Sequence, residues 1–366
     1  MLKSLVGIAF SLVVAFGDAA LADTAKLKIG LSLPLSGNSA LLGSQFLAGA
    51  GLALSELAPD GGIEIVTADD QCDARIAGLA AQDLKSADVA LVAGFLCNEP
   101  VRPAAIVFKE SGVPLLIAGA RSEQIIRDAA KEEWNLFRIA PGDDRAAEAT
   151  FRFLSERWRG TPWAIIDDGT VYGRGLADIL REKMEEIGQP PQFADNFRPA
   201  QSTQAGLIRR LQRSGVSAAF VAGGAEDISI IWSNVREFGA RMEVAGGEAL
   251  EALQWTDAAG TTPDGLLAVM LPDPLTLPAT AELARRMEKA AIEPEPYAFS
   301  GYATMQLALQ ALRPSGSETT QALKDTIFHT VLGNVRFDER GANRVDRFDL
   351  FVWRNGNFVP AEAPQQ

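Results

Sequence analysis

Short apolar runs with strand character alternate with segments of helical apolar spacing along the first third of the chain. Strands are predicted at residues 27–33, 63–68, 89–93 and 113–118, and helices at 42–57, 76–84 and 103–109. This rhythm is typical of parallel sheets, because parallel neighbours need a long crossover that a helix supplies. The pattern therefore predicts an α/β unit with helices on both faces of a parallel sheet.

The same alternation begins again near Trp134 and fills the middle of the chain. Strands are predicted at 134–139, 163–167, 218–222, 242–245 and 266–271, with helices at 145–157, 173–187 and 228–239. Asp143 and Asp144 stand before the first of these helices, where an aspartate can cap free backbone N–H groups. A chain of 366 residues suits two domains, so the pattern predicts two units of similar construction.

The last part of the chain departs from this rhythm. Helical patterns at 298–312 and 318–327 precede a hairpin-like region at 335–344 and 347–359, with turns at Gly341 and Asn355-Gly356. No linker longer than a few residues separates the two units. They are therefore expected to be joined by several short crossings and not by one flexible tether.

Residues 1–22 have the composition of a secretory signal peptide. Lys3 supplies a positive start, residues 5–16 form an apolar core, and Ala20-Leu21-Ala22 offers small residues for cleavage before Asp23. A membrane anchor is the alternative, but the apolar run is short for the ~20 residues that a spanning helix needs. The mature protein is therefore expected in the periplasm.

Two cysteines stand at equivalent points of the pattern. Cys72 and Cys97 each follow an apolar strand-like run and open a polar turn before a helix. Strand ends on the same edge of one sheet can bring two such side chains together, and exported proteins form disulfides readily. A Cys72–Cys97 disulfide is predicted, with two free buried thiols as the alternative.

Composition excludes several classes of function. The net charge of −13 at pH 7 argues against nucleic acid and anionic membranes as partners. The single histidine, His329, is interpreted as a helix-end residue, so neither a histidine-based triad nor a zinc site can be assembled. The sequence has no P-loop, no dinucleotide-binding glycine motif and no G-x-S-x-G. A binding protein is predicted, not an enzyme, with no cofactor and no metal.

Several segments, in their order and spacing, resemble one known family. They include KIGLSLPLSGNSALLG (28–43), DDQCD (69–73), GFLCN (94–98), FRIAPGDD (137–144) and FDERGANR (337–344). Over essentially all of the chain after residue 22, the sequence resembles the periplasmic substrate-binding proteins of branched-chain amino acid ABC transporters, the Leu/Ile/Val-binding type. The resemblance implies two Rossmann-like α/β lobes joined by a three-strand hinge, with a ligand cleft between them.

The resemblance also implies domain limits and partners. Residues 23–142 with 272–346 would form the first lobe, and residues 143–271 with 347–366 the second. The chain would act as a monomer that captures a small amino acid or related carboxylate and delivers it to the permease subunits of an ABC transporter. The alternative is a ligand-sensing receptor module for an amide or for an aromatic or dicarboxylic acid.

The family's carboxylate-binding positions fall on the first lobe. Asn98 would bind the carboxylate, and the Gly119-Ala120-Arg121 turn would donate backbone N–H groups to it. Asn98 replaces the family's usual hydroxyl residue, and Arg121 stands where threonine or serine is common. Arg121 can hold a carboxylate bidentately, pair with Glu99 or point to solvent.

The remaining family positions would close the site. Tyr172 and Glu248 come from the second lobe, Glu248 as the acceptor for an α-ammonium group, and Asp143 stands at the hinge. Leu42 and Phe299 would line the side-chain pocket. The structural alternatives are packing between lobes for Tyr172, helix caps for Glu248 and Asp143, and a core position for Phe299.

Overall fold

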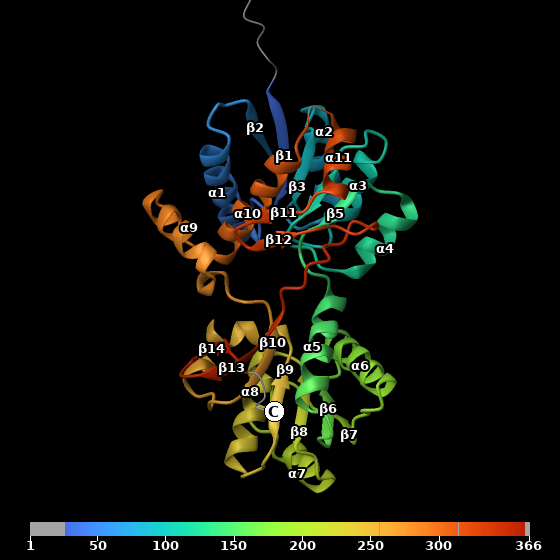
Figure 1. Ribbon diagram of the computed structural model, residues 1–366, viewed down its shortest axis with the longest axis vertical. Helices are drawn as coiled ribbons and strands as arrows, with labels where there is room; N and C mark the ends of the chain where they lie inside the picture. The colour runs from blue at the N-terminus through green and yellow to red at the C-terminus, as the bar shows by residue number, and fades with distance from the viewer. Residues whose placement is uncertain (1–25, 256, 314, 363–366) are drawn as a thin grey trace, which may run out of the picture.

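Two separate sheets organise the chain, one in each half of the molecule (Figure 1). The structure is a computed structural model that describes residues 26–255, 257–313 and 315–362. The predicted signal peptide and its cleavage site lie outside these residues. The two halves, called here the first and the second lobe, are stacked along the long axis of the molecule.

The first lobe is built on a parallel five-stranded sheet in the order β2-β1-β3-β4-β5. The strands are β1 (Leu27–Leu33), β2 (Ile63–Asp69), β3 (Leu91–Gly94), β4 (Leu115–Ile117) and β5 (Leu136–Arg138). Between them run the helices α1 (Ala40–Leu57), α2 (Ala74–Ser86), α3 (Val101–Phe108) and α4 (Glu123–Glu132). β3 and β4 are buried along their whole length, as expected for parallel strands covered on both faces.

A late segment of the chain completes the first lobe. It contains α9 (Pro278–Lys289), α10 (Pro296–Ala311), α11 (Gly316–Asp325) and the hairpin β11 (Phe328–Thr330) and β12 (Gly333–Val335). α10 and β11 carry buried residues of the same core as β1 and α1. The first lobe therefore depends on two stretches of sequence that lie on either side of the second lobe.

α1 and α10 approach each other closely because glycines face the partner backbone. A Cβ added at Gly49 would lie 1.9 Å from the carbonyl oxygen of Ala298, and one at Gly301 would lie 2.0 Å from that of Phe46. By length and composition α1 is apolar enough to cross a membrane, with a mean hydropathy of 1.3 over 18 residues. Its residues Phe46, Ala50 and Ala53 are instead buried in the first-lobe core.

The second lobe contains a mixed seven-stranded sheet in the order β14-β13-β10-β9-β8-β6-β7. Its strands are β6 (Trp163–Asp167), β7 (Phe193–Asn196), β8 (Ala218–Ala222), β9 (Glu243–Gly246), β10 (Leu267–Met270), β13 (Asp349–Arg354) and β14 (Asn357–Pro360). Only β13 and β14 run antiparallel to their neighbours. Its helices are α5 (Asp143–Arg157), α6 (Val171–Glu186), α7 (Ala205–Ser214) and α8 (Ala225–Glu237), with short helical turns η1 (Glu248–Trp255) and η2 (Asp257–Gly260).

Within the described residues the chain crosses between the lobes three times. The first crossing is 139–142, after β5; the second is 271–277, after β10, and contains the turn η3 (Pro274–Thr276); the third is 336–348, between β12 and β13. The first and third crossings are bonded together, because the Asn343 side-chain amide donates to the carbonyl of Ile139 at 3.0 Å. Several short crossings were predicted, and this is what the structure has.

Three local predictions have clear outcomes. Asn355-Gly356 forms the two-residue turn of the β13–β14 hairpin, with positive φ at both positions, as this dipeptide favours. The predicted aspartate cap of α5 is wrong, because Gly142 is the N-cap residue and Asp143 is already in the first helical turn. His329 lies in β11, not at a helix end, and its Nδ1 bonds the Asn334 side-chain oxygen at 2.8 Å.

Candidate functional site

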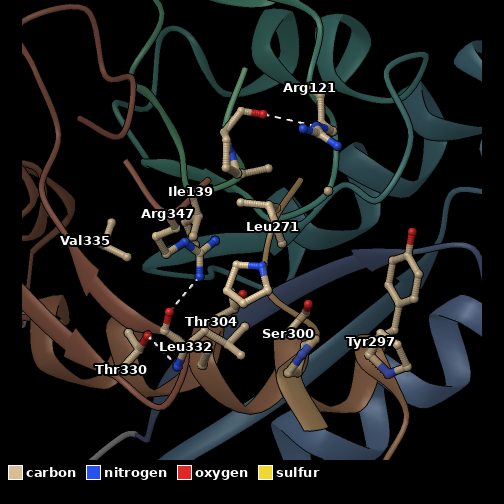
Figure 2. Close-up of a pocket in the computed structure, with 18 of the residues that line it drawn as sticks. Arg121, Ile139, Leu271, Tyr297, Ser300, Thr304, Thr330, Leu332, Val335 and Arg347 are labelled. Atoms are coloured by element: carbon tan, nitrogen blue, oxygen red, sulfur yellow. Dashed lines mark hydrogen bonds between the residues drawn. The ribbon is translucent and has the colours of Figure 1, made fainter. Parts of the chain in front are cut away.

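A cavity of about 230 Å³ lies between the lobes and is bordered by all three crossings (Figure 2). Its apolar wall includes Leu96, Ile139, Leu271, Leu277, Leu332 and Val335. Its polar groups are Arg121, Glu251, Tyr297, Ser300, Thr304, Thr330 and Arg347. Most of these residues follow the ends of first-lobe strands or belong to α10, whereas Glu251 comes from η1 of the second lobe. A mainly apolar cavity with a few convergent polar groups is typical of a small-molecule site.

Arg121 reaches across the space between the lobes and pairs with Glu248. The Arg121 Nη2 and Glu248 Oε2 atoms are 2.5 Å apart, and the two side chains are only 30% and 13% exposed. Arg121 Nε also donates to the carbonyl of Pro141 in the first crossing, at 3.1 Å. The two residues predicted to hold opposite ends of a ligand therefore bind each other in this structure.

The turn that carries Arg121 is held by hydrogen bonds inside the first lobe. The N–H groups of Gly119 and Ala120 both donate to the carbonyl of Phe95, at 3.3 and 3.0 Å. Asn98 accepts from the Ser122 N–H at 3.2 Å and so joins two neighbouring loops. Gly119 lines the cavity, but its N–H and that of Ala120 are occupied by protein in this conformation.

The predicted side-chain pocket falls on other residues of α10. Phe299 is completely buried in the first-lobe core, whereas Tyr297 and Ser300 of the same helix line the cavity. One residue along a helix turns the side chain by about 100°, so neighbouring positions face different surroundings. Leu42, on α1, is partly buried against the first-lobe core and is not among the cavity residues.

Among the described second-lobe candidates, neither Glu248 nor Tyr172 is a lining residue of this cavity. Tyr172 lies in the first turn of α6, which the Thr170 hydroxyl caps by accepting from Gly173 N–H at 3.0 Å, and its side chain is 45% exposed. Asp143 begins α5 directly after the first crossing, and its side chain is outside what the structure describes. The sequence missed Glu251, which supplies the second-lobe carboxylate of the cavity.

Glu251 and Tyr297 are two titratable groups of the cavity lining whose pKa values are shifted by their surroundings. Desolvation raises the pKa of Glu251, and the negative charges of Glu248 and Asp273 add to this, while Arg121 acts in the opposite direction. Burial and the charge of Glu251 also raise the pKa of Tyr297, so its phenol stays protonated. A group that carries hydrogen-bond donors or positive charge suits this part of the cavity lining.

Arg347 lies on the opposite side of the view from Tyr297 in Figure 2. It belongs to the third crossing, and its Nη1 donates to the carbonyl of Leu332 at 2.7 Å. Its Nε is buried without a hydrogen-bond partner among the described residues. Burial lowers the pKa of Arg347, and the positive charge of Arg121 lowers it further.

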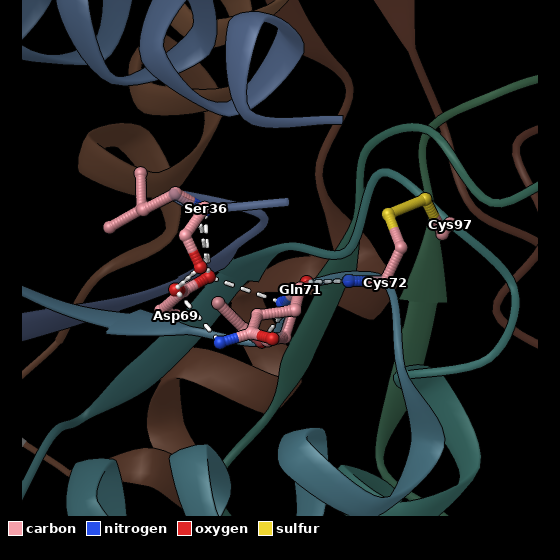
Figure 3. Close-up of a disulfide and its surroundings, with 8 residues drawn as sticks. Ser36, Asp69, Gln71, Cys72 and Cys97 are labelled. Carbon is pink, nitrogen blue, oxygen red and sulfur yellow. Dashed lines mark hydrogen bonds between the residues drawn. A yellow bond between two sulfur atoms is a disulfide. The ribbon is translucent and has the colours of Figure 1, made fainter. Parts of the chain in front are cut away.

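A disulfide closes the loops beside this cavity, between Cys72 after β2 and Cys97 after β3 (Figure 3). Their Cα atoms are 5.5 Å apart, within the usual range for a disulfide, and the prediction is confirmed. Cys97 directly follows the cavity residue Leu96. Burial raises the pKa of the neighbouring Asp70, although it accepts from Cys72 N–H at 3.0 Å and from the Ser32 hydroxyl at 2.8 Å.

Three comparisons place this geometry among known proteins. A family model described as "Periplasmic binding protein" matches residues 26–354. The Leu/Ile/Val-binding protein homolog 1 of Brucella suis biovar 1 is 28% identical over 360 residues, which cover 96% of this chain and 95% of the relative. The structure of a putative branched-chain amino acid ABC transporter from Rhodospirillum rubrum covers 92% of this chain and 100% of its own, with a TM-score of 0.79 and 22% identity.

A further solved structure is similar in fold at lower identity. It is a solute-binding protein of an ABC transporter from Rhodopseudomonas palustris BisB5, in complex with 3,4-dihydroxy benzoic acid. It covers 92% of this chain and 95% of its own, with a TM-score of 0.65 and 18% identity.

The solved structure shows the fold, which is the two-lobed type I periplasmic binding fold. The chain belongs to the periplasmic binding protein family. The family resemblance and the fold class predicted from the sequence are therefore confirmed. The family is non-enzymatic, in agreement with the catalytic motifs that the sequence lacks.

Proposed function

We propose that this protein captures a small amino acid or related carboxylate in the cavity between its lobes and delivers it to the permease of an ABC transporter. The observation that carries the proposal is the cavity itself. It is bordered by both lobes and by every crossing, and it combines an apolar wall with two arginines and a carboxylate. A ligand in this position touches the parts that must move relative to each other when the lobes close.

The proposed mechanism is closure about the three crossings. The moving bodies would be residues 23–142 with 272–346 and residues 143–271 with 347–366. Closure needs contacts that exist only when ligand is bound, because a ligand shifts an equilibrium only through its differential affinity for the two states. Glu251 and, on further closure, Tyr172 and Asp143 are the second-lobe groups proposed to make these contacts.

The Arg121–Glu248 ion pair gives the cleft a ligand-dependent switch. A ligand ammonium group competes with Arg121 for Glu248 and can replace the arginine half of the pair. An α-amino acid carries such an ammonium group beside its carboxylate. The Brucella relative is named a Leu/Ile/Val-binding protein homolog, which supports this ligand class.

An apolar or aromatic acid without an ammonium group is the second candidate. It is favoured by the same ion pair, because Glu248 is already neutralised by Arg121 and needs no ligand cation. The Rhodopseudomonas protein of similar fold was solved with 3,4-dihydroxy benzoic acid, which is such a compound. The mainly apolar wall of the cavity suits both candidates.

A thermal-shift screen on protein that was unfolded, dialysed and refolded tests the proposal. The panel is leucine, isoleucine, valine, benzoate, 3,4-dihydroxybenzoate, succinate and the amides leucinamide and benzamide. A ligand that binds only the folded state raises the melting temperature by mass action, and isothermal titration then gives its affinity. A shift with the branched-chain amino acids supports the first candidate, a shift only with the aromatic acids supports the second, and no shift with any member contradicts the proposal.

A further inference from the structure

We infer that Arg347 is the anchor for the ligand's carboxylate, so that the anion binds at the third crossing and not at the Gly119-Ala120-Arg121 turn. This inference rests on the proposed capture of a carboxylate and assigns the residue that recognises it. Arg347 lines the cavity, and its buried Nε has no hydrogen-bond partner among the described residues. Of the two cavity arginines, it is therefore the one with fewer hydrogen-bond and charge partners within the protein.

The two arginines of the cavity differ in their partners. Arg121 already has a carboxylate partner in Glu248 and also donates to Pro141. Arg347 has a single described hydrogen bond, to the Leu332 carbonyl, and forms no ion pair in the part of the chain that the structure describes. A partly buried guanidinium without a counter-ion is unfavourable unless an anion arrives from outside.

The charges around Arg347 strengthen the demand for an anion. The charged group acting on it is Arg121, whose positive charge adds to the effect of burial and lowers the pKa of Arg347. An anion placed in the cavity relieves both unfavourable effects at once. The guanidinium fork also matches the two oxygens of a carboxylate geometrically.

Other donors of the proposed anion site are weaker. The N–H groups of Gly119 and Ala120, which the family resemblance assigned to the carboxylate, already donate to Phe95. The hydroxyls of Thr304 and Thr330 also line the cavity, and Figure 2 shows both on the Arg347 side of the view. They can support an anion but carry no charge of their own.

The position of Arg347 couples ligand binding to lobe movement. It stands in the third crossing, one residue before Phe348, which is buried in the second-lobe core. Its Nη1 is held by Leu332 of the first lobe. An anion that binds Arg347 therefore fixes the crossing relative to the first lobe, and the second-lobe strand β13 follows directly.

The test uses matched ligands and matched variants of the mature chain. The ligand pairs are leucine with leucinamide and benzoate with benzamide, which differ in the carboxylate. The variants are Arg347→Gln, Arg347→Lys and the control Arg336→Gln, which removes the same charge from an exposed residue in the same crossing. Affinities are measured by titration calorimetry, and melting temperatures are measured without ligand.

Arg347→Gln is expected to weaken the bound carboxylate at least tenfold, as for loss of a charge-assisted contact, while its affinity for the amide stays within threefold. Arg347→Lys is expected to retain part of the affinity, and Arg336→Gln all of it. The ligand-free Arg347→Gln protein is expected to melt higher than Arg336→Gln, because an uncompensated charge has been removed. A variant that melts higher is folded, so a loss of affinity in it belongs to the site.

The failures of the two proposals are distinguishable. If a carboxylate binds the wild type and Arg347→Gln equally well, the anchor is refuted and solute capture stands. If amides bind the wild type as tightly as their carboxylates, the anchor is again refuted and capture stands. If no member of the screening panel binds, the proposed capture fails, and an Arg347→Gln protein that melts no higher than Arg336→Gln then refutes the argument from charge as well.

Discussion

The close approach of α1 and α10 predicts opposite effects for two identical substitutions in one helix. Gly49 and Gly51 both lie inside α1, two residues apart. A Cβ at Gly49 would lie 1.9 Å from the Ala298 carbonyl oxygen, whereas a Cβ at Gly51 has nothing within 4 Å. Gly49→Ala and Gly51→Ala therefore share the same change in helix propensity but differ in the space available.

The magnitudes follow from these two distances. Replacing glycine by alanine inside a helix stabilises it by about 0.5–1 kcal/mol, which is the whole effect expected for Gly51→Ala. Gly49→Ala requires α10 to move away by about 1.5 Å, because the obstacle is backbone that cannot change rotamer. Overpacking of this kind costs about 1–3 kcal/mol or more, so Gly49→Ala is expected to lower the free energy of unfolding despite its better propensity.

The assay must report on the first lobe alone. Tryptophan fluorescence is unsuitable, because five of the six tryptophans lie in second-lobe segments, at 158, 163, 232, 255 and 353. Hydrogen exchange of peptides from β1 and α1, read by mass spectrometry, gives the local free energy of opening. Urea unfolding followed by circular dichroism supplies the global midpoint.

The result that refutes the reasoning is simple. If Gly49→Ala is as stable as Gly51→Ala, the helices are not as close as described and the glycine has no packing role. Gly301→Ala tests the same contact from the other helix, because its Cβ would lie 2.0 Å from the Phe46 carbonyl oxygen. It should behave like Gly49→Ala.

Three further predictions concern the disulfide, the cross-lobe ion pair and a buried aspartate. Replacing Cys72 and Cys97 together by alanine should cost about 3.5 kcal/mol in the chain-entropy model for a separation of 25 residues, and reductant should lower the urea midpoint of the wild type but not of the variant. Arg121→Gln and Glu248→Gln should each widen the ligand-free cleft, which X-ray scattering would detect as a larger radius of gyration. The double variant should add little to either single change, because the two residues form one ion pair with a coupling free energy of about 1 kcal/mol. Independent effects of the two substitutions would contradict the pairing. Burial raises the pKa of Asp70 above 3.8, so its contribution favours folding at low pH and is lost as the pH rises above that value; Asp70→Asn should therefore gain stability over the wild type at pH 7 but not near pH 3, measured by urea unfolding.

Local sequence patterns predict an element well where both of its faces are buried. β8, with the sequence AAFVA, is fully buried and was predicted at its observed limits. The edge strand β7 was missed, because its sequence FADN alternates over only four residues and is half exposed. α4, α7 and α9 were also missed, although apolar residues at helical spacing in α7 carry a usable signal.

The site was harder to predict because it depends on the position of one lobe relative to the other. Arg121 and Glu248 were both selected, but their mutual pairing is a property of the distance between lobes and not of either local sequence. Phe299 was selected where Ser300 lines the cavity, since a motif does not fix the rotation of a helix to one residue. Arg347, in the segment RVDRFDLF, was not predicted as a site residue, although the predicted lobe boundary at 346–347 lies at a crossing.

The three crossings also determine when the protein can fold during synthesis. The first-lobe core contains α1 near the N-terminus and α10, which ends at Ala311, with the bulk of the second lobe made in between. The second-lobe core in turn contains Trp353 and Phe358 from the last hairpin. Neither core can close until nearly the whole chain has been made, so the growing polypeptide exposes two unfinished apolar surfaces, and contacts of such long sequence separation form slowly.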